Sequence, residues 1–221
     1  MKYKYVFFDW GYTLISKFEN VDDKINNILK KYNLEWNDIF NKWKNYQILN
    51  SLGRVTEKEV YKDLSLILNI SEEDLEKIDM LLLESHILDD ETRETITKLY
   101  EKGYYLGIIS NNSIRNVEYI LKRENIKKYF KKIVISEEIK ERKPNIKVYL
   151  KAFEDIPKEK YNEIAFVSDE LLEDLLGVKV LGVKTIWYEQ NINNKWKKKE
   201  KVLMEPDYKI KSMKELLDII K

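Results

Sequence analysis

Near its N-terminus the chain reads Tyr5-Val6-Phe7-Phe8-Asp9-Trp10-Gly11-Tyr12-Thr13-Leu14. Four apolar or aromatic residues in a row are typical of a strand that is buried on both faces, as strands of parallel sheets are. The run ends abruptly at Asp9. Because ligands of parallel α/β sheets bind at the carboxyl ends of the strands, Asp9 is a candidate functional residue.

The rest of the chain predicts how this strand is surrounded. Further buried strands are expected at Tyr104–Ile109, Ile133–Ile135, Ile164–Val167, Thr185–Trp187 and Tyr208–Ile210. Helical patterns lie between or after them, near residues 113–124, 145–154, 170–177 and 212–220. This alternation predicts an α/β fold with a Rossmann-like, doubly wound parallel sheet.

Residues 17 to 88 show a different pattern, with apolar residues at helical spacing. Thr56 and Glu59 form a capping box at the start of one helix, and Ser71 precedes another. No strand-like alternation occurs in this region. We therefore predict an all-helical domain of residues 17–88, inserted into a core of residues 1–16 and 89–221.

Composition excludes several classes of function. The 221 residues include 40 Lys and Arg against 39 Asp and Glu, so the formal net charge is +1, which provides no global field for nucleic acid or anionic membranes. The absence of Cys excludes thiol nucleophiles and Cys-ligated metals, and the single His excludes His-rich metal sites. Without a signal-peptide core or a membrane span, a cytoplasmic protein is expected.

Polar residues follow the other predicted strands. Ser110 and Asn111 end the second, Asp169 ends the fourth with Asp174 five residues further on, and Lys143 stands shortly before a helix. Together with Asp9, these residues bring three carboxylates, a hydroxyl and an ammonium to one rim of the sheet. Converging carboxylates repel unless a cation intervenes, and Mg²⁺ is the hard, oxygen-preferring cation that suits them.

These four motifs, in this order, resemble those of the haloacid dehalogenase superfamily. The resemblance covers residues 5–14, 106–111, 143–144 and 169–174, and the helical insert after the first motif is similar to the cap of the first type in that superfamily. It implies a Mg²⁺-dependent phosphohydrolase that acts on a small phosphorylated metabolite through an aspartyl-phosphate intermediate. Nucleic acid and membrane partners are not expected.

The resemblance also assigns roles to matching positions. It makes Asp9 the nucleophile and Lys143 its catalytic partner. The implied metal ligands are Asp9, the carbonyl of Gly11, Asp169 and, directly or through water, Asp174. Thr13 would support the nucleophile loop, and the transferring group would be bound by Ser110, Asn111 and Lys143.

Gly11 departs from the pattern. Phosphatases of this superfamily usually carry a second Asp there, as general acid and then base, and losing such a group costs roughly 10²–10⁴-fold in rate. Tyr12, with a phenol of pKa about 10, is a poor replacement at neutral pH, and His86 near the end of the insert is another candidate acid. Three explanations stay open: a phosphohydrolase with good leaving groups or another acid, a 2-haloacid dehalogenase-like or phosphonatase-like reaction, and a catalytically weak member that binds a phosphorylated ligand.

The acidic motif favours the first explanation. Dehalogenases of the superfamily lack the metal and resemble Ser-Asn where this chain has Ser168 and Asp169. A phosphonatase would need a Lys in the insert for a Schiff base, but Arg54 stands in the expected stretch and cannot form that adduct. The Arg54 guanidinium is suited to binding a second anionic group of the substrate.

The lysine-rich loop at 190–201 is expected to be solvated.

Overall fold

A computed structural model describes residues 3–190 and 204–221. Its main feature is a six-stranded sheet in the order β5-β4-β1-β6-β7-β8, with every neighbouring pair parallel. The strands are β1 Tyr5–Phe8, β4 Tyr105–Ser110, β5 Phe130–Ile135, β6 Ile164–Ser168, β7 Lys184–Tyr188 and β8 Tyr208–Ile210. The predicted parallel α/β core is confirmed, and β1 lies at its centre between β4 and β6.

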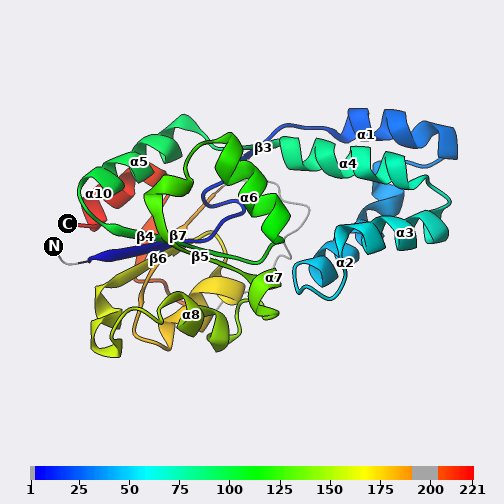
Figure 1. Cartoon of the computed structure of the whole chain (residues 1–221). Coiled ribbons are helices and arrows are strands. Elements are labelled where there is room, and N and C mark those ends of the chain that lie inside the picture. The colour runs from blue at the N-terminus through cyan, green and yellow to red at the C-terminus, as the bar shows by residue number, and fades with distance from the viewer. Residues whose placement is uncertain (1–2, 191–203) are drawn as a thin grey trace.

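Helices cover both faces of this sheet, which explains the continuous apolar run of β1. Val6 and Phe8 point to the face covered by α5 (Asp90–Glu101), α6 (Ile114–Arg123) and α10 (Leu216–Ile219), whereas Phe7 points to the face covered by α8 (Ile146–Ala152). Figure 1 shows these two helical layers with the sheet between them. Since successive strand residues alternate between faces, a strand between two apolar layers needs apolar residues throughout.

The shorter helical segments of the core complete these layers. They are α7 (Ser136–Ile139), α9 (Gly177–Lys179), a π-helix (Leu171–Leu176) and 3₁₀ helices at Lys127–Tyr129, Lys158–Glu163 and Met213–Glu215. The helix predicted near 170–177 is therefore largely a π-helix. The loop predicted at 190–201 lies, apart from its first residue, outside the described residues. No helix within residues 3–190 and 204–221 is long and apolar enough to cross a membrane.

Residues 22 to 84 form a separate helical lobe, which extends to one side of the sheet in Figure 1. Its helices are α1 (Asp22–Leu29), a 3₁₀ turn (Lys30–Tyr32), α2 (Trp36–Asn50), α3 (Glu57–Leu68) and α4 (Glu72–Glu84). The predicted capping box is present, since Thr56 accepts a hydrogen bond from the backbone of Glu59 and the Glu59 carboxylate accepts one from Thr56. The lobe has its own apolar core, in which Trp36 and Trp43 pack edge to face.

The insert is not helical at its two ends. Lys17–Phe18 (β2) pairs antiparallel with His86–Ile87 (β3), so the outgoing and returning chains run side by side. Strands of two residues show no alternation in a sequence, which is why the prediction of an all-helical segment omitted them. The division into a core of residues 1–16 and 89–221 and a helical domain of residues 17–88 stays a prediction.

Gly107 leaves room for the ring of Phe7. It pairs with Phe7 across the two strands, and a Cβ built on Gly107 would lie 2.3 Å from a carbon of the Phe7 ring. That ring is fully buried against Phe153. A side chain at position 107 would therefore displace the ring that packs the centre of the sheet.

We expect Gly107→Ala to lower the free energy of unfolding by about 1–3 kcal/mol, because the added methyl group overpacks the core. Urea unfolding followed by circular dichroism measures this. In a Phe7→Leu background, which removes the ring, the same substitution should cost less than half as much. Equal costs in the two backgrounds would show that the ring is not the cause.

Candidate active site

The predicted strand-end residues meet at the carboxyl edge of β1, β4 and β6. Asp9 follows β1, Ser110 ends β4, and Asp169 follows β6, while Asp174 comes from the π-helix. Lys143 arrives from the loop between α7 and α8. All five residues are buried although four of them are ionisable, and such groups are rarely buried without partners.

The Lys143 ammonium connects three of these segments. Its Nζ donates hydrogen bonds to Asp9 Oδ1 at 2.5 Å, to Asp174 Oδ2 at 2.7 Å and to the carbonyl of Ile109 at 3.0 Å. Burial lowers the pKa of Lys143, but the two carboxylates raise it by more, so that the net shift is upward. Lys143 therefore remains a cation, and its three N–H donors are all engaged.

Asp174 is held by two donors on one oxygen. Ser168 donates from Oγ to Asp174 Oδ2 at 2.6 Å, beside the bond from Lys143. Burial raises the pKa of the Asp174 carboxyl to about 8, and the charge of Asp9 acts in the same direction against the opposing effect of Lys143. One buried ammonium is thus shared by two buried carboxylates, and the site is short of positive charge.

Thr13 ties the loop after β1 to the loop after β6. Its hydroxyl donates to Asp169 Oδ1 and accepts from the Asp169 backbone N–H, both at 3.1 Å. Trp187 on β7 donates from its indole nitrogen to the carbonyl of Asp169 at 3.2 Å. Thr13 therefore positions the loop after β6, which carries Asp169, as well as the loop after β1, to which Thr13 belongs.

Asn111 positions Lys143. Its Oδ1 accepts from the backbone N–H of Lys143 at 2.8 Å, and its Nδ2 donates to the carbonyl of Lys143 at 3.2 Å. Both ends of the amide are thus used to fix the segment that carries the lysine. The sequence indicated Asn111 only as a contact to the transferring group, because nothing in it shows that residues 111 and 143 are neighbours.

The space beside Gly11 is open. A Cβ built on this residue meets no atom within 4 Å, apart from its chain neighbours, in the part of the chain that the structure describes. Gly11 is not among the residues with a positive φ. An added Cβ therefore fits at this position without backbone strain and without a collision with the described residues.

The two candidate replacements for the missing acid, Tyr12 and His86, both pack against Phe18. Tyr12 adopts the left-handed conformation, with φ of 58°, and its ring lies 4.4 Å from that of Phe18 on β2. Burial, followed by the charge of Asp169, raises the pKa of Tyr12 far above that of a free phenol. His86 packs edge to face on Phe18, its Nδ1 lies 2.6 Å from the carbonyl of Leu82, and burial lowers its pKa.

The loop between α2 and α3 touches the core near Lys143. Ser136 donates from Oγ to the carbonyl of Ser51 at 2.6 Å, and the Arg142 guanidinium donates to the Ser51 hydroxyl. Arg54, three residues further on, is exposed. The Lys147 ammonium lowers the pKa of the Glu141 carboxyl, and the charge of Arg54 adds to this effect. The structure thus brings Arg54 to the segment that carries Lys143.

Hard oxygen donors are available for a metal ion, although they are not gathered into a closed site. Among the described residues, no three His, Cys, Asp or Glu side chains are arranged as a ligand cluster. Asp174 turns its Oδ2 toward Lys143 and Ser168. The remaining donors are the carboxylates of Asp9 and Asp169 and the carbonyl of Gly11. One or two carboxylates are the usual protein contribution to a Mg²⁺ site that also holds waters and phosphate oxygens.

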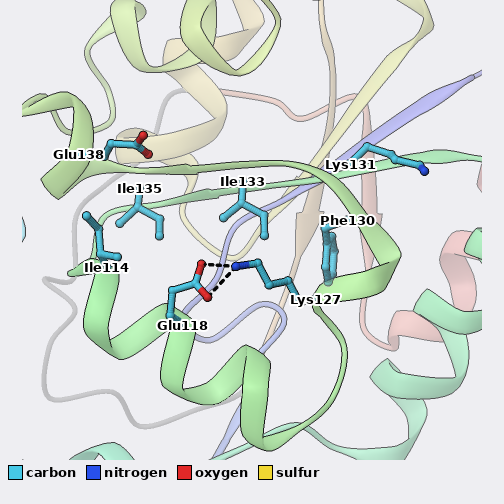
Figure 2. Close-up of a pocket in the computed structure, with 8 residues that line it drawn as sticks. All are labelled: Ile114, Glu118, Lys127, Phe130, Lys131, Ile133, Ile135 and Glu138. Atoms are coloured by element: carbon cyan, nitrogen blue, oxygen red, sulfur yellow. Dashed lines mark hydrogen bonds and ion pairs between the residues drawn. The ribbon is translucent and has the colours of Figure 1, made fainter.

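A groove elsewhere on the molecule contains none of the predicted site residues. Figure 2 shows this groove of about 470 Å³ beside the edge strand β5 and helix α6, with Ile133 and Ile135 on its floor. Glu118 and Lys127 form an ion pair at 2.8 Å across it. Since β5 is an outer strand of the sheet, the groove marks the sheet edge rather than the strand ends.

The sequence of the chain matches a family model and part of a characterised relative. The sequence model of the family described as haloacid dehalogenase-like hydrolase matches residues 6–188. The glyceraldehyde 3-phosphate phosphatase of Pyrococcus abyssi is 35% identical over 98 residues. The matched segment spans 44% of this chain and only 40% of that relative.

Solved structures show the same fold over the whole chain. The magnesium-bound structure of the putative HAD-hydrolase YfnB from Bacillus subtilis matches with a TM-score of 0.67 and 23% identity, covering 100% of both chains. A 2-haloacid dehalogenase from Pseudomonas syringae matches with a TM-score of 0.62 and 16% identity, covering 99% of this chain and 98% of that one. At such identities the likeness concerns the fold and does not separate one reaction from another. With a family model that spans β1 to β7, the chain belongs to the haloacid dehalogenase-like hydrolases.

Proposed function

We propose that the protein is a Mg²⁺-dependent phosphohydrolase that acts on a small phosphorylated metabolite through phosphorylation of Asp9. The observation that carries this proposal is the Lys143 ammonium between Asp9 and Asp174, with the Asp169 carboxylate held beside them by Thr13. An acidic site suits a metal and a phosphate better than it suits a substrate carboxylate. The partial match to a glyceraldehyde 3-phosphate phosphatase supports phosphate as the group transferred.

The residues present fit Mg²⁺. The carboxylates of Asp9 and Asp169 and the carbonyl of Gly11 would hold it, and Asp174, whose Oδ2 is bound by Lys143 and Ser168, would contribute through water. Three carboxylates against one ammonium leave an excess of negative charge that a divalent cation balances. When bound, the ion neutralises charge on the phosphoryl oxygens.

Asp9 carries the covalent chemistry in this proposal. Lys143 holds Oδ1, so the carboxylate attacks phosphorus through Oδ2, and the bond from phosphorus to the leaving oxygen breaks. Ser110 would donate to the phosphoryl oxygens, and Asn111 keeps the Lys143 backbone in place. Water then attacks the phosphorus of phospho-Asp9, which releases phosphate and restores the carboxylate.

The helical insert is proposed as a cap that selects the substrate. The loop from Ser51 to Arg54 contacts the core through Ser136 and Arg142, immediately before Lys143 in the chain. From this loop the Arg54 guanidinium would bind a second anionic group on a substrate seated over Asp9. Closure of such a domain also excludes bulk water from the reaction.

Replacing the nucleophile tests the mechanism directly. Asp9→Asn keeps the size of the side chain but removes the nucleophilic carboxylate, so turnover of p-nitrophenyl phosphate should fall at least about 10³-fold. Asp155→Asn, at a surface carboxyl whose side chain is 66% exposed, serves as the matched control and should retain full activity. An active Asp9→Asn variant would contradict the proposed role.

Metal removal tests whether the activity requires Mg²⁺. Treatment with EDTA should abolish phosphatase activity, and added Mg²⁺ should restore it, since the carboxylate-rich site lacks sufficient positive charge on its own. Ca²⁺ should restore much less, because it needs more oxygen ligands. Metal-independent hydrolysis of 2-haloacids would overturn the proposal in favour of the dehalogenase-like alternative.

Arg54→Ala tests the role of the insert. For phosphoglycolate, which carries a carboxylate besides its phosphate, we expect KM to rise about tenfold or more with little change in kcat, as for loss of one charge-assisted hydrogen bond. For p-nitrophenyl phosphate, KM should stay the same. Lys58→Ala, on the exposed start of α3, is the control for loss of a nearby positive charge. Equal effects on the two substrates would contradict a second anionic subsite.

A further inference from the structure

We propose, on the basis of the proposed function, that the natural substrate is an anhydride of phosphoric acid, either an acyl phosphate or a diphosphate, rather than an alkyl phosphate ester. The observation behind this is the open space at Gly11 beside the nucleophile, where a built Cβ meets nothing within 4 Å among the described residues outside its chain neighbours. A leaving group can occupy that space, but it meets no proton donor from position 11.

Lys143 does not supply the missing proton. An ammonium has three N–H donors, and those of Lys143 go to Asp9, Asp174 and the carbonyl of Ile109. The residue is fully enclosed, with a side chain that is 1% exposed. Donation to a leaving group would break one of these three bonds, two of which are to buried carboxylates.

The neighbouring aromatic residues are poor donors. Tyr12, whose ring lies against Phe18, carries a phenol, which is a weak acid at neutral pH. His86 also packs on Phe18, and its Nδ1 lies 2.6 Å from the carbonyl of Leu82. Since a carbonyl only accepts, this contact fixes the proton of the imidazole on Nδ1. In the neutral ring Nε2 then carries no proton to give.

Without a proton from Gly11, Lys143, Tyr12 or His86, the leaving group departs as an anion. As the Asp9 oxygen bonds to phosphorus, the bond between phosphorus and the leaving oxygen breaks, and that oxygen takes the electron pair without a proton. An alkyl ester would release an alkoxide, which is comparable with hydroxide, whose conjugate acid has a pKa of about 15.7. An acyl phosphate releases a carboxylate of pKa about 4, and a diphosphate releases a phosphate that ionises near pKa 6. Of these three leaving groups, the two released by anhydrides depart readily without an acid.

The test measures how kcat/KM depends on the basicity of the leaving group. The substrates are acetyl phosphate, inorganic pyrophosphate, aryl phosphates with phenols of graded pKa, and glycerol phosphate, all with saturating Mg²⁺. For the natural chain we expect kcat/KM to fall steadily with leaving-group pKa, by at least about 10³-fold from acetyl phosphate to glycerol phosphate. The acetyl phosphate and pyrophosphate arms distinguish the two anhydrides.

Gly11→Asp places a carboxyl at the position that lacks an acid, and a Cβ built there meets none of the described residues within 4 Å apart from its chain neighbours. We expect this variant to raise the ratio of kcat/KM for glycerol phosphate to that for acetyl phosphate about 10²-fold or more. Gly11→Asn fills the same space without an acidic proton and should keep the steep dependence of the natural chain. Circular dichroism of both variants confirms that they are folded.

Two results would overturn the inference. One of them leaves the proposed phosphohydrolase function intact, and the other excludes that function as well. If the natural chain turns over glycerol phosphate as well as acetyl phosphate, another group supplies the proton, and the phosphohydrolase function itself stands. If neither the natural chain nor Gly11→Asp hydrolyses any of these phosphates with Mg²⁺, the proposed function fails and the substrate class fails with it.

Discussion

The site depends on one buried ammonium whose donors are all engaged. Lys143 joins the end of β1 through Asp9, the end of β4 through Ile109 and the π-helix through Asp174. Removing one partner of a buried charged pair leaves an uncompensated charge, which is strongly destabilising. The sheet order places β1 next to β4, so a residue that reaches over this edge contacts both strand ends at once. Asn111 holds the lysine backbone there.

The same arrangement explains why Gly11 has chemical consequences. A lysine is one substitute for a missing acid, but Lys143 is needed to balance Asp9 and Asp174. The excess of carboxylate at this edge is hidden in a formal net charge of +1 for the whole chain. Local charge, rather than the total, determines which ions and substrates the site can accept.

The sequence predicts the parts of the site that follow from strand ends. Asp9, Ser110 and Asp169 each close an apolar run, and the carboxyl ends of parallel strands share one edge, so their convergence was predictable. The pairing of Asn111 with the Lys143 backbone was not, because it depends on a contact across 32 residues. The left-handed backbone of Tyr12 was missed for a similar reason. A bulky residue adopts that conformation only where tertiary packing, here on Phe18, holds it.

The helical insert is joined to the core by polar contacts and by an apolar contact at the end of α4, where Leu83 belongs to a cluster that packs on the sheet and Met80 packs against it. Its own core around Trp36 and Trp43 is separate from the two clusters that pack on the sheet. Hydrogen bonds to Ser51 and an ion pair between Asp79 and Arg115 link the two parts. The insert therefore folds around an apolar core of its own, while Leu83 and Met80 anchor the end of α4 to the apolar layer on the sheet.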